Sequence, residues 1–146
     1  MSLTLSQTFK TITSIYEGNR DELAKKMAEL CATYFLNSFL AKKWEGNDWD
    51  KLSNPYADIK AKKFPGKPIL VKSGDLESAF LKSLVDGVSN ATLNQIEFNV
   101  DNSYASFHNE GDGNLPKRQF MGINDELVEN IVKLVEEEIQ KELNRI

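Results

Sequence analysis

The chain has 146 residues, 40% of them hydrophobic, which is the size of one domain that buries roughly two thirds of its unfolded surface. Its formal net charge of -4 at pH 7 means that the average surface repels phosphate, so general nucleic-acid binding is disfavoured. No apolar run approaches the ~20 residues that span a bilayer, and the N-terminus lacks the pattern of a signal peptide. We therefore expect no membrane association and synthesis in the cytoplasm.

Two helices are predicted in the N-terminal part of the chain. Apolar residues at helical spacing predict a short helix over residues 5–16, which Gly18 and Asn19 end. A stronger pattern over residues 21–43 carries two adjoining apolar stripes, wide enough for burial on two sides. Cys31 lies within these stripes and suits a small buried hydrophobe better than a disulfide partner or a nucleophile.

A long segment without periodicity follows. Residues 44–68 accumulate glycine, proline and asparagine, which predicts an excursion with at most a turn of helix. We expect residues 45–67 to form a long flexible loop that is mobile in the free protein and ordered on assembly, with Trp49 buried by a neighbouring subunit. The region is basic, because residues 42–72 hold eight lysines against four acids.

The central part of the chain predicts a small sheet. Residues 69–71 read as a short extended segment, and Ser73 is placed to cap a helical turn from Gly74. Residues 80–88 are ambiguous between helix and strand. We favour a strand, because apolar and polar residues alternate over residues 95–100 and this second strand can pair with the first after a turn near residues 89–92.

The C-terminal part ends in an acidic helix. Residues 104–108 predict one helical turn, followed by a loop at residues 111–114 and a short extended stretch around residues 120–123. Asn124 is placed to cap the final helix, whose first turn carries two acids. The apolar face of this helix is Leu127, Ile131, Leu134, Val135 and Ile139. Residues 124–146 hold seven acids against three basic residues.

These elements predict a single domain over residues 1–146 of the α+β class. N-terminal helices and a C-terminal helix would pack on a small, mainly antiparallel sheet, and the long basic loop would project from it. Attraction between the basic loop and the acidic helix is worth little within one chain. Between the subunits of a ring the same polarity repeats at every contact and sets the orientation.

The sequence offers little for catalysis or metal binding. One histidine and one distant cysteine supply too few zinc ligands, and a buried Cys31 paired with His108 is a poor nucleophile and base. Asp48 and Asp50 are too few oxygen ligands for calcium, and the Gly-Asp-Gly at residues 111–113 is a turn, without the strand and helix of a phosphate loop. We expect His108 to be structural, hydrogen-bonded to backbone, and we expect no enzyme activity, no cofactor and no metal.

Four segments in order carry a family resemblance: Trp49, Leu52, Ser53, Tyr56 and Lys60, then residues 69–78, 104–111 and 115–122. They resemble the virion morphogenesis, or tail completion, family of Mu-like phages. Its members have a Trp and Leu-Ser in a loop, an Ile-Leu then Gly-x-Leu element, a Tyr-Ala-x-x-His segment and a Pro-x-Arg-x-Phe-Leu-Gly segment. The similarity runs from about residue 20 to the C-terminal helix, with departures at Asn109, Glu110 and Met121.

The resemblance implies a structural, non-catalytic part of a virion that completes the tail or joins tail to head. It implies a ring-shaped homo-oligomer that contacts other tail or connector proteins, with DNA in the channel as a further contact and no membrane. The virion would be its location and the host cytoplasm its site of synthesis. The candidate interface or fold-determining residues are Trp49, Tyr56, Tyr104, His108, Pro116, Arg118, Phe120 and Gly122.

The motif residues also make physical sense by themselves. Pro116 restricts its own backbone and that of the preceding residue, so that Arg118 and Phe120 project from an extended segment to a common side. Phe120 then suits the core, Arg118 offers donors to a backbone or carboxylate partner, and Gly122 allows a tight bend. Whether these residues serve the fold alone or also subunit contacts stays open.

Two alternatives to tail completion remain. One is a head-to-tail adaptor or minor capsid protein. The other is a small enzyme or ligand-binding module centred on His108, which an apolar pocket with convergent polar groups beside that histidine would favour.

Overall fold

The computed structural model describes residues 17–18, 20–71, 74–112 and 115–145. Five helices lie in this part of the chain: α2 (Arg20–Ala41), α3 (Asn54–Lys63), α4 (Asp75–Ser89), α5 (Ala105–Glu110) and α6 (Asp125–Asn144). Strands β1 (Lys43–Trp44) and β2 (Asn47–Asp48) form a small antiparallel sheet. The fold is therefore α+β, as predicted. The helix predicted over residues 5–16 and the cap predicted at Ser73 lie outside the described residues.

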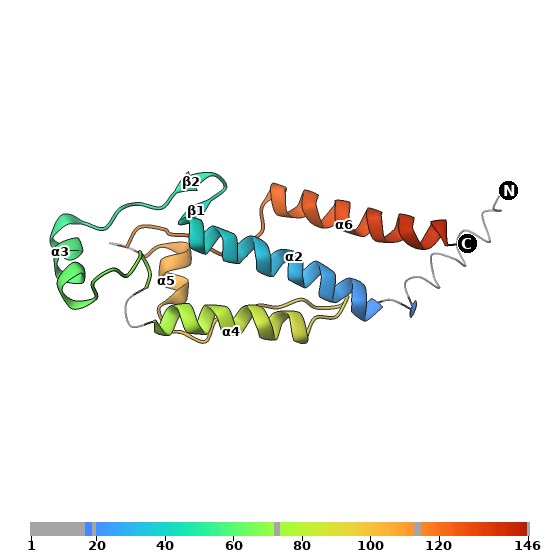
Figure 1. Ribbon diagram of the computed structural model, residues 1–146, viewed down its shortest axis with the longest axis horizontal. Helices are drawn as coiled ribbons and strands as arrows, with labels where there is room; N and C mark the ends of the chain where they lie inside the picture. The colour runs from blue at the N-terminus through green and yellow to red at the C-terminus, as the bar shows by residue number, and fades with distance from the viewer. Residues whose placement is uncertain (1–16, 19, 72–73, 113–114, 146) are drawn as a thin grey trace.

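Helix α2 is the central element of an elongated molecule. It runs beside both α4 and α6, and α3 lies at one end of the long axis (Figure 1). The prediction that this helix is buried on two sides is confirmed. Ala24 and Ala28 are fully buried, and the pair forms a small cluster with Ala91, whereas Cys31 and the phenylalanines of α2 enter the main core. Burial raises the pKa of the Cys31 thiol, which keeps it protonated and inert.

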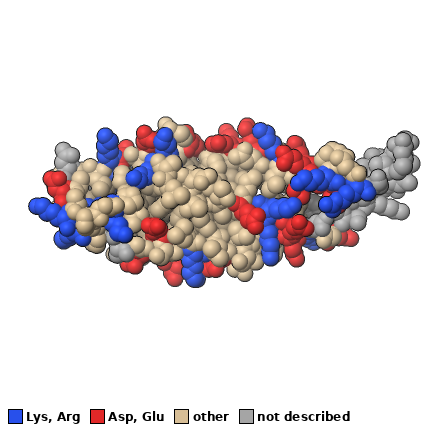
Figure 2. Space-filling view, viewed as in Figure 1, with Lys and Arg blue, Asp and Glu red and all other residues tan. Residues whose placement is uncertain are grey.

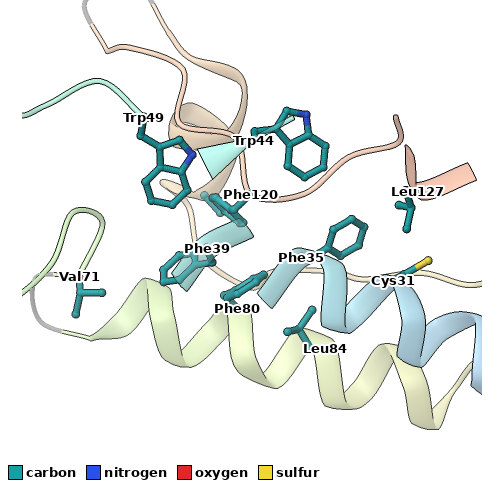
Figure 3. Close-up of a cluster of buried hydrophobic side chains, with 11 residues drawn as sticks. Cys31, Phe35, Phe39, Trp44, Trp49, Val71, Phe80, Leu84, Phe120 and Leu127 are labelled. Atoms are coloured by element: carbon teal, nitrogen blue, oxygen red, sulfur yellow. The ribbon is translucent and has the colours of Figure 1, made fainter. Parts of the chain in front are cut away.

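The main core is dominated by aromatic rings from distant parts of the chain (Figure 3). Phe39 stacks on Phe80 with ring centroids 4.8 Å apart, and Phe120 meets both rings edge-on at 5.6 and 5.2 Å. Such offset and T-shaped contacts are the favoured geometries of aromatic pairs. This aromatic cluster joins α2, α4 and the segment before α6, as the close-up shows.

The sheet lies within the segment that was predicted to be an irregular excursion. Glu45 and Gly46 both have positive φ, 53° and 78°, which gives the two-residue turn that closes a tight hairpin. Trp44 is buried, with its ring edge-on to Tyr34 at a centroid distance of 5.7 Å. The hairpin thus places a large side chain in the core directly after α2.

The same segment contains α3, so the prediction of at most one helical turn over residues 44–68 is wrong. Pro55 stands in the first helical turn, where its fixed φ favours a helix, and alanines and lysines fill much of the remainder. The side chain of Lys60 is buried and its ammonium donates to the carbonyl of Pro68. A long apolar stripe is absent from this helix, which explains why periodicity failed to reveal it.

The burial of Trp49 differs from what the sequence predicts. We expected a neighbouring subunit to bury it, but it is 7% exposed in the single chain, edge-on to Phe39 at a centroid distance of 5.9 Å. Its burial therefore needs no partner. The mobility of residues 45–67 stays a prediction. The buried side chains of Trp49 and Lys60 would limit it.

The strands predicted in the centre of the chain are wrong. Residues 80–88 belong to α4, in which Phe80 and Leu84 repeat at helical spacing on the buried side. Residues 96–100 are extended and alternate between half-buried and exposed, as a strand would. They pack on α4, however, and no strand among the described residues pairs with them. The stretches at residues 69–71 and 120–123 are not strands either. Leu70 has φ 68°, and the Val71 N–H donates to Pro68 in a turn.

Gly87 permits the close approach of α4 and the extended segment. A Cβ at this position would lie 2.3 Å from the Phe98 ring and 2.9 Å from the Glu97 carbonyl oxygen. Both distances are shorter than atoms tolerate. The missing side chain therefore makes room for Phe98 to reach the core.

We expect Gly87→Ala to lower the free energy of unfolding by about 1 kcal/mol, although alanine normally stabilises a helix interior by a similar amount. The overpacking against Phe98 reverses the usual sign. Urea denaturation measures the effect, and Ser78→Ala on the exposed side of α4 is the matched control, expected to be neutral or slightly stabilising. A stabilised Gly87→Ala protein would contradict the tight packing.

The C-terminal helix begins as predicted. The side chain of Asn124 accepts a hydrogen bond of 2.8 Å from the Leu127 N–H, and its amide donates to the Tyr34 hydroxyl at 2.8 Å. The cap therefore also ties α6 to α2. Leu127 is fully buried, and the rest of the predicted apolar face is half-buried, which confirms the face.

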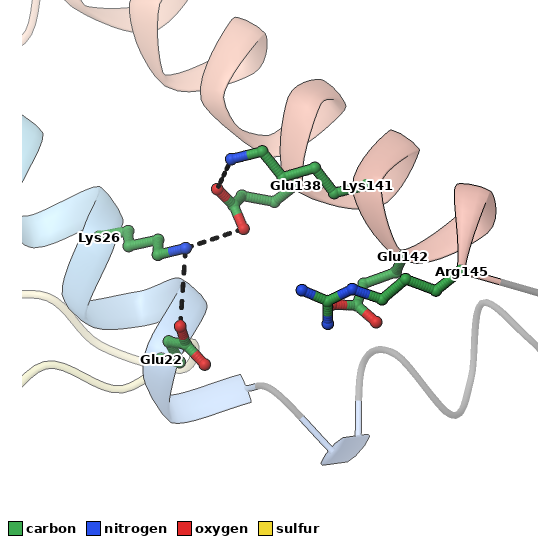
Figure 4. A network of polar contacts seen from close by, with 6 residues as sticks. All are labelled: Glu22, Lys26, Glu138, Lys141, Glu142 and Arg145. Carbon is green, nitrogen blue, oxygen red and sulfur yellow. Dashed lines mark hydrogen bonds and ion pairs between the residues drawn. The ribbon is translucent and has the colours of Figure 1, made fainter.

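Polar contacts join α2 and α6 farther along (Figure 4). The Glu138 carboxylate lies 3.0 Å from the Lys26 ammonium and 3.2 Å from that of Lys141, and Lys26 also approaches Glu22 at 3.6 Å. The hydrogen bond from Lys26 is the main cause that lowers the pKa of Glu138, and the same bond raises the pKa of Lys26. Because the groups are partly exposed, their contribution is to orientation more than to stability.

Candidate functional site

Arg118 connects two of the segments that carry the family resemblance. Its side chain is 5% exposed and donates from Nε to the Asp50 carbonyl at 3.0 Å and from Nη2 to the Lys51 carbonyl at 3.3 Å. Its backbone N–H donates to the His108 carbonyl at 2.8 Å. Burial lowers the pKa of the guanidinium, but arginine keeps its charge. The expected backbone partner of Arg118 is confirmed.

Trp49 and the segment around Phe120 meet at the same place. The Trp49 indole N–H donates to the Gln119 carbonyl at 2.8 Å, and Phe120 is 1% exposed in the aromatic core. Trp49, in the segment after β2, therefore binds residues 118–120, and Arg118 in turn binds the segment after β2. We call this arrangement the motif junction.

Asn109 belongs to the motif junction and was missed by sequence reasoning, which treated it as a departure from the family pattern. Its Oδ1 accepts from the N–H groups of Phe120 and Met121 at 2.9 and 3.0 Å, and its Nδ2 donates to the Met121 carbonyl at 3.0 Å. The side-chain amide thus makes the hydrogen bonds to this backbone segment that a neighbouring strand would otherwise make. Only the amide character of the residue hinted at this role.

The remaining candidate residues, apart from His108, differ in their burial and in their distance from the motif junction. Tyr104 is the N-cap residue of α5 and is 65% exposed, while Pro116 is half-buried. A Cβ on Gly122 would lie 2.3 Å from Gln119 Nε2 and 3.3 Å from the Trp44 ring, so the chain passes closely there. Tyr56 lies on α3 and is 39% exposed. The motif junction thus includes Trp49, Arg118 and Phe120, with Gly122 beside it.

His108 is half-buried on α5, as the predicted helical turn required, but its ring differs from expectation. Nδ1 is buried and has no hydrogen-bond partner among the described residues, whereas we expected a backbone partner. Burial lowers the pKa of His108, and the nearby charge of Arg118 lowers it further. The ring is therefore neutral at pH 7.

A cavity of about 490 Å³ lies between α3, α5 and the start of α4. Its volume is within the range of small-molecule pockets. Apolar and aromatic side chains make up most of its wall, with a few polar groups between them: Tyr56, Phe64, Leu70, Asp75, Leu76, Asn102, Tyr104 and His108. The side chains of Tyr56, Tyr104 and His108 thus line a cavity, although the His108 carbonyl also accepts the Arg118 N–H of the motif junction.

Protonation of His108 gives a prediction with a defined sign. The folded-state pKa lies below the ordinary 6.5, so the unfolded chain binds the proton more readily. The contribution of His108 to stability is complete above about pH 6.5 and is lost as pH falls through that value toward the folded-state pKa. Urea midpoints measured between about pH 7.5 and pH 5.5 should therefore fall more for the wild type than for His108→Gln.

Proton NMR can follow the titration of His108 directly, because it is the only histidine in the chain. Its ring resonances should titrate below the value of a free histidine in proton NMR. A midpoint at or above the ordinary value, or equal pH dependence of both proteins, would contradict the buried neutral ring.

Within the described ranges, no group of three or more His, Cys, Asp or Glu side chains is placed to hold a metal ion. Over the same ranges, no helix combines the length and the apolar character needed to cross a membrane. The chain matches no family model, and neither a curated protein nor a solved structure matches it.

Proposed function

We propose that the chain is a non-catalytic structural subunit of a tailed-phage particle, which completes the tail or joins it to the head as part of a ring. The family resemblance implies this role. Virion tail or connector proteins are then its partners, and the virion is its location after synthesis in the host cytoplasm. DNA in the channel is a further contact under the same proposal.

The motif junction is the observation that carries the proposal. The Trp49 indole bonds to Gln119, 70 positions away, and the Arg118 guanidinium bonds to Asp50, 68 positions away. The Arg118 N–H bonds to the His108 carbonyl and joins the segment of residues 104–111 to the same place. Segments that resemble a family in the same order should contact one another if they belong to one shared fold. The contacts support the resemblance on grounds independent of the sequence pattern.

Binding to phage tails tests the proposal. Purified protein is mixed with tails of the same phage assembled without this subunit, and the tails are sedimented and imaged after immunogold labelling. We expect label at one end of each tail. Tails that already contain the subunit are the control and should take up no more. Label along the whole tube, or none at all, would contradict the role.

The cavity beside His108 favours a second candidate, a ligand-binding module for a small aromatic molecule. Its wall combines aromatic rings with the polar groups Asp75 and Asn102, which is the composition of many ligand sites. Titration with phenol or tyramine, followed through the ring resonances of His108, tests this candidate. Saturable shifts that Leu76→Trp abolishes by filling the cavity would support it, and unchanged resonances would exclude these ligands.

A further inference from the structure

The outward face of α3 combines apolar and basic side chains. Tyr56, Ile59, Lys62 and Lys63 are all exposed, Ile59 by 50%, and helical spacing places them on one side. Lys60, one turn after Tyr56, borders this side and is buried. We call the four exposed residues the α3 face. Figure 2 shows Lys and Arg side chains, in blue, at the end of the molecule that α3 forms.

The outward face of α6 has the complementary composition. Val128 and Val132 are 44% and 47% exposed, and Asp125, Glu129 and Glu136 surround them at helical spacing. We call these five residues the α6 face. The helix as a whole carries seven acids against two lysines. Its apolar pair is thus bordered by carboxylates, as Ile59 is bordered by ammonium groups on α3.

The two faces lie apart in one chain. Helix α3 is at one end of the molecule, whereas α6 extends along the opposite half (Figure 1). The two faces of one chain therefore cannot contact each other, but the α3 face of one copy can contact the α6 face of another. We propose that the α3 face of one copy docks on the α6 face of the next, so that Ile59 packs against Val128 and Val132 while Lys62 and Lys63 meet Glu129 and Glu136.

This docking rests on the proposed function and specifies its subunit contact. Two different faces of one chain make a heterologous contact, which repeats from copy to copy and closes a ring if the rotation allows it. Apolar contact provides affinity, and the charge pattern disfavours contact between two α3 faces or between two α6 faces, because like charges would then meet. The tail binding of the assembled ring is a separate property.

Charge reversal tests the docking. Lys62→Glu with Lys63→Glu makes the α3 face acidic, and Glu129→Lys with Glu136→Lys makes the α6 face basic. Each double variant alone should self-associate about a hundredfold more weakly than the wild type, because like charges meet. All four positions are exposed, so the fold should survive, which circular dichroism verifies.

Mixing the two double variants is the decisive step. The acidic α3 face of one variant fits the basic α6 face of the other, and the unchanged faces fit as in the wild type. Light scattering of an equimolar mixture should therefore recover association that neither variant shows alone. Lys25→Glu with Lys82→Glu, two exposed lysines on α2 and α4, changes the net charge as much as Lys62→Glu with Lys63→Glu does and should leave association intact.

Several outcomes would overturn the docking. It is wrong if the wild type stays monomeric at the highest attainable concentration, if either double variant associates like the wild type, or if the mixture recovers nothing. Tail binding by the wild type in those cases would leave the proposed function standing. Association by the docking rules without any tail binding would instead keep the contact and reject the proposed function.

Discussion

Phe120→Ala should lower the free energy of unfolding by about 3 to 5 kcal/mol, the range seen when a fully buried phenylalanine is truncated. Phe120 is 1% exposed and touches Phe39 and Phe80, so its removal leaves a cavity where α2, α4 and the segment before α6 meet. Urea denaturation measures the loss. The whole domain should unfold at lower urea, because this ring packs where α2, α4 and the segment before α6 meet in the main core.

The matched control is Phe107→Ala. Phe107 is 43% exposed on α5, and the same truncation there should change the free energy of unfolding by less than about 1 kcal/mol. If Phe120→Ala fails to fold, Phe120→Leu gives a graded test with a cost of about 1 kcal/mol. Equal losses for Phe107→Ala and Phe120→Ala would show that Phe120 is not the ring that closes the core.

Arg118→Met should lower the free energy of unfolding by about 2 to 3 kcal/mol, because charge-assisted hydrogen bonds to two carbonyls are lost while the aliphatic volume is kept. Those carbonyls belong to Asp50 and Lys51. The loss should be concentrated there. Hydrogen exchange should rise over residues 49–53 and extend into α3, whereas α2 and α6 keep their protection.

Lys117→Met is the neighbouring control. Lys117 is exposed and its replacement should change neither the stability nor the exchange of residues 49–53. Uniform exchange across the whole chain of Arg118→Met would contradict a local role, since it would mean that Arg118 supports the core as a whole and not one segment.

The contacts of Arg118 also bear on the question that the sequence left open. Both of its side-chain partners are backbone groups of the same chain, and Trp49 and Phe120 are likewise engaged within the chain. These three residues are therefore fold determinants in the free protein. Subunit contact, under the proposal, falls to exposed residues that carried no motif, such as Ile59 and Val132.

The sequence by itself determined helices α2 and α6 and their ends, but not α4, which was predicted as a strand over residues 80–88. The periodicity of α2 and α6 and the cap at Asn124 are local properties, since a helix makes its backbone hydrogen bonds within itself. The buried Cys31 and the one-turn α5 followed from the same local signals. The alternation over residues 96–100 also predicted correctly which side chains face inward.

Only the tertiary structure decided where strands form and which distant residues meet. A strand needs a partner, and residues 96–100 lie instead against α4, where the absent side chain of Gly87 admits Phe98. Helix α3 is anchored by the buried Lys60, which donates to the Pro68 carbonyl, a contact that hydrophobic periodicity does not encode. The motif junction joins residues 68 positions apart, and the hydrogen bonds from Arg118 exist only where the tertiary fold places both segments side by side.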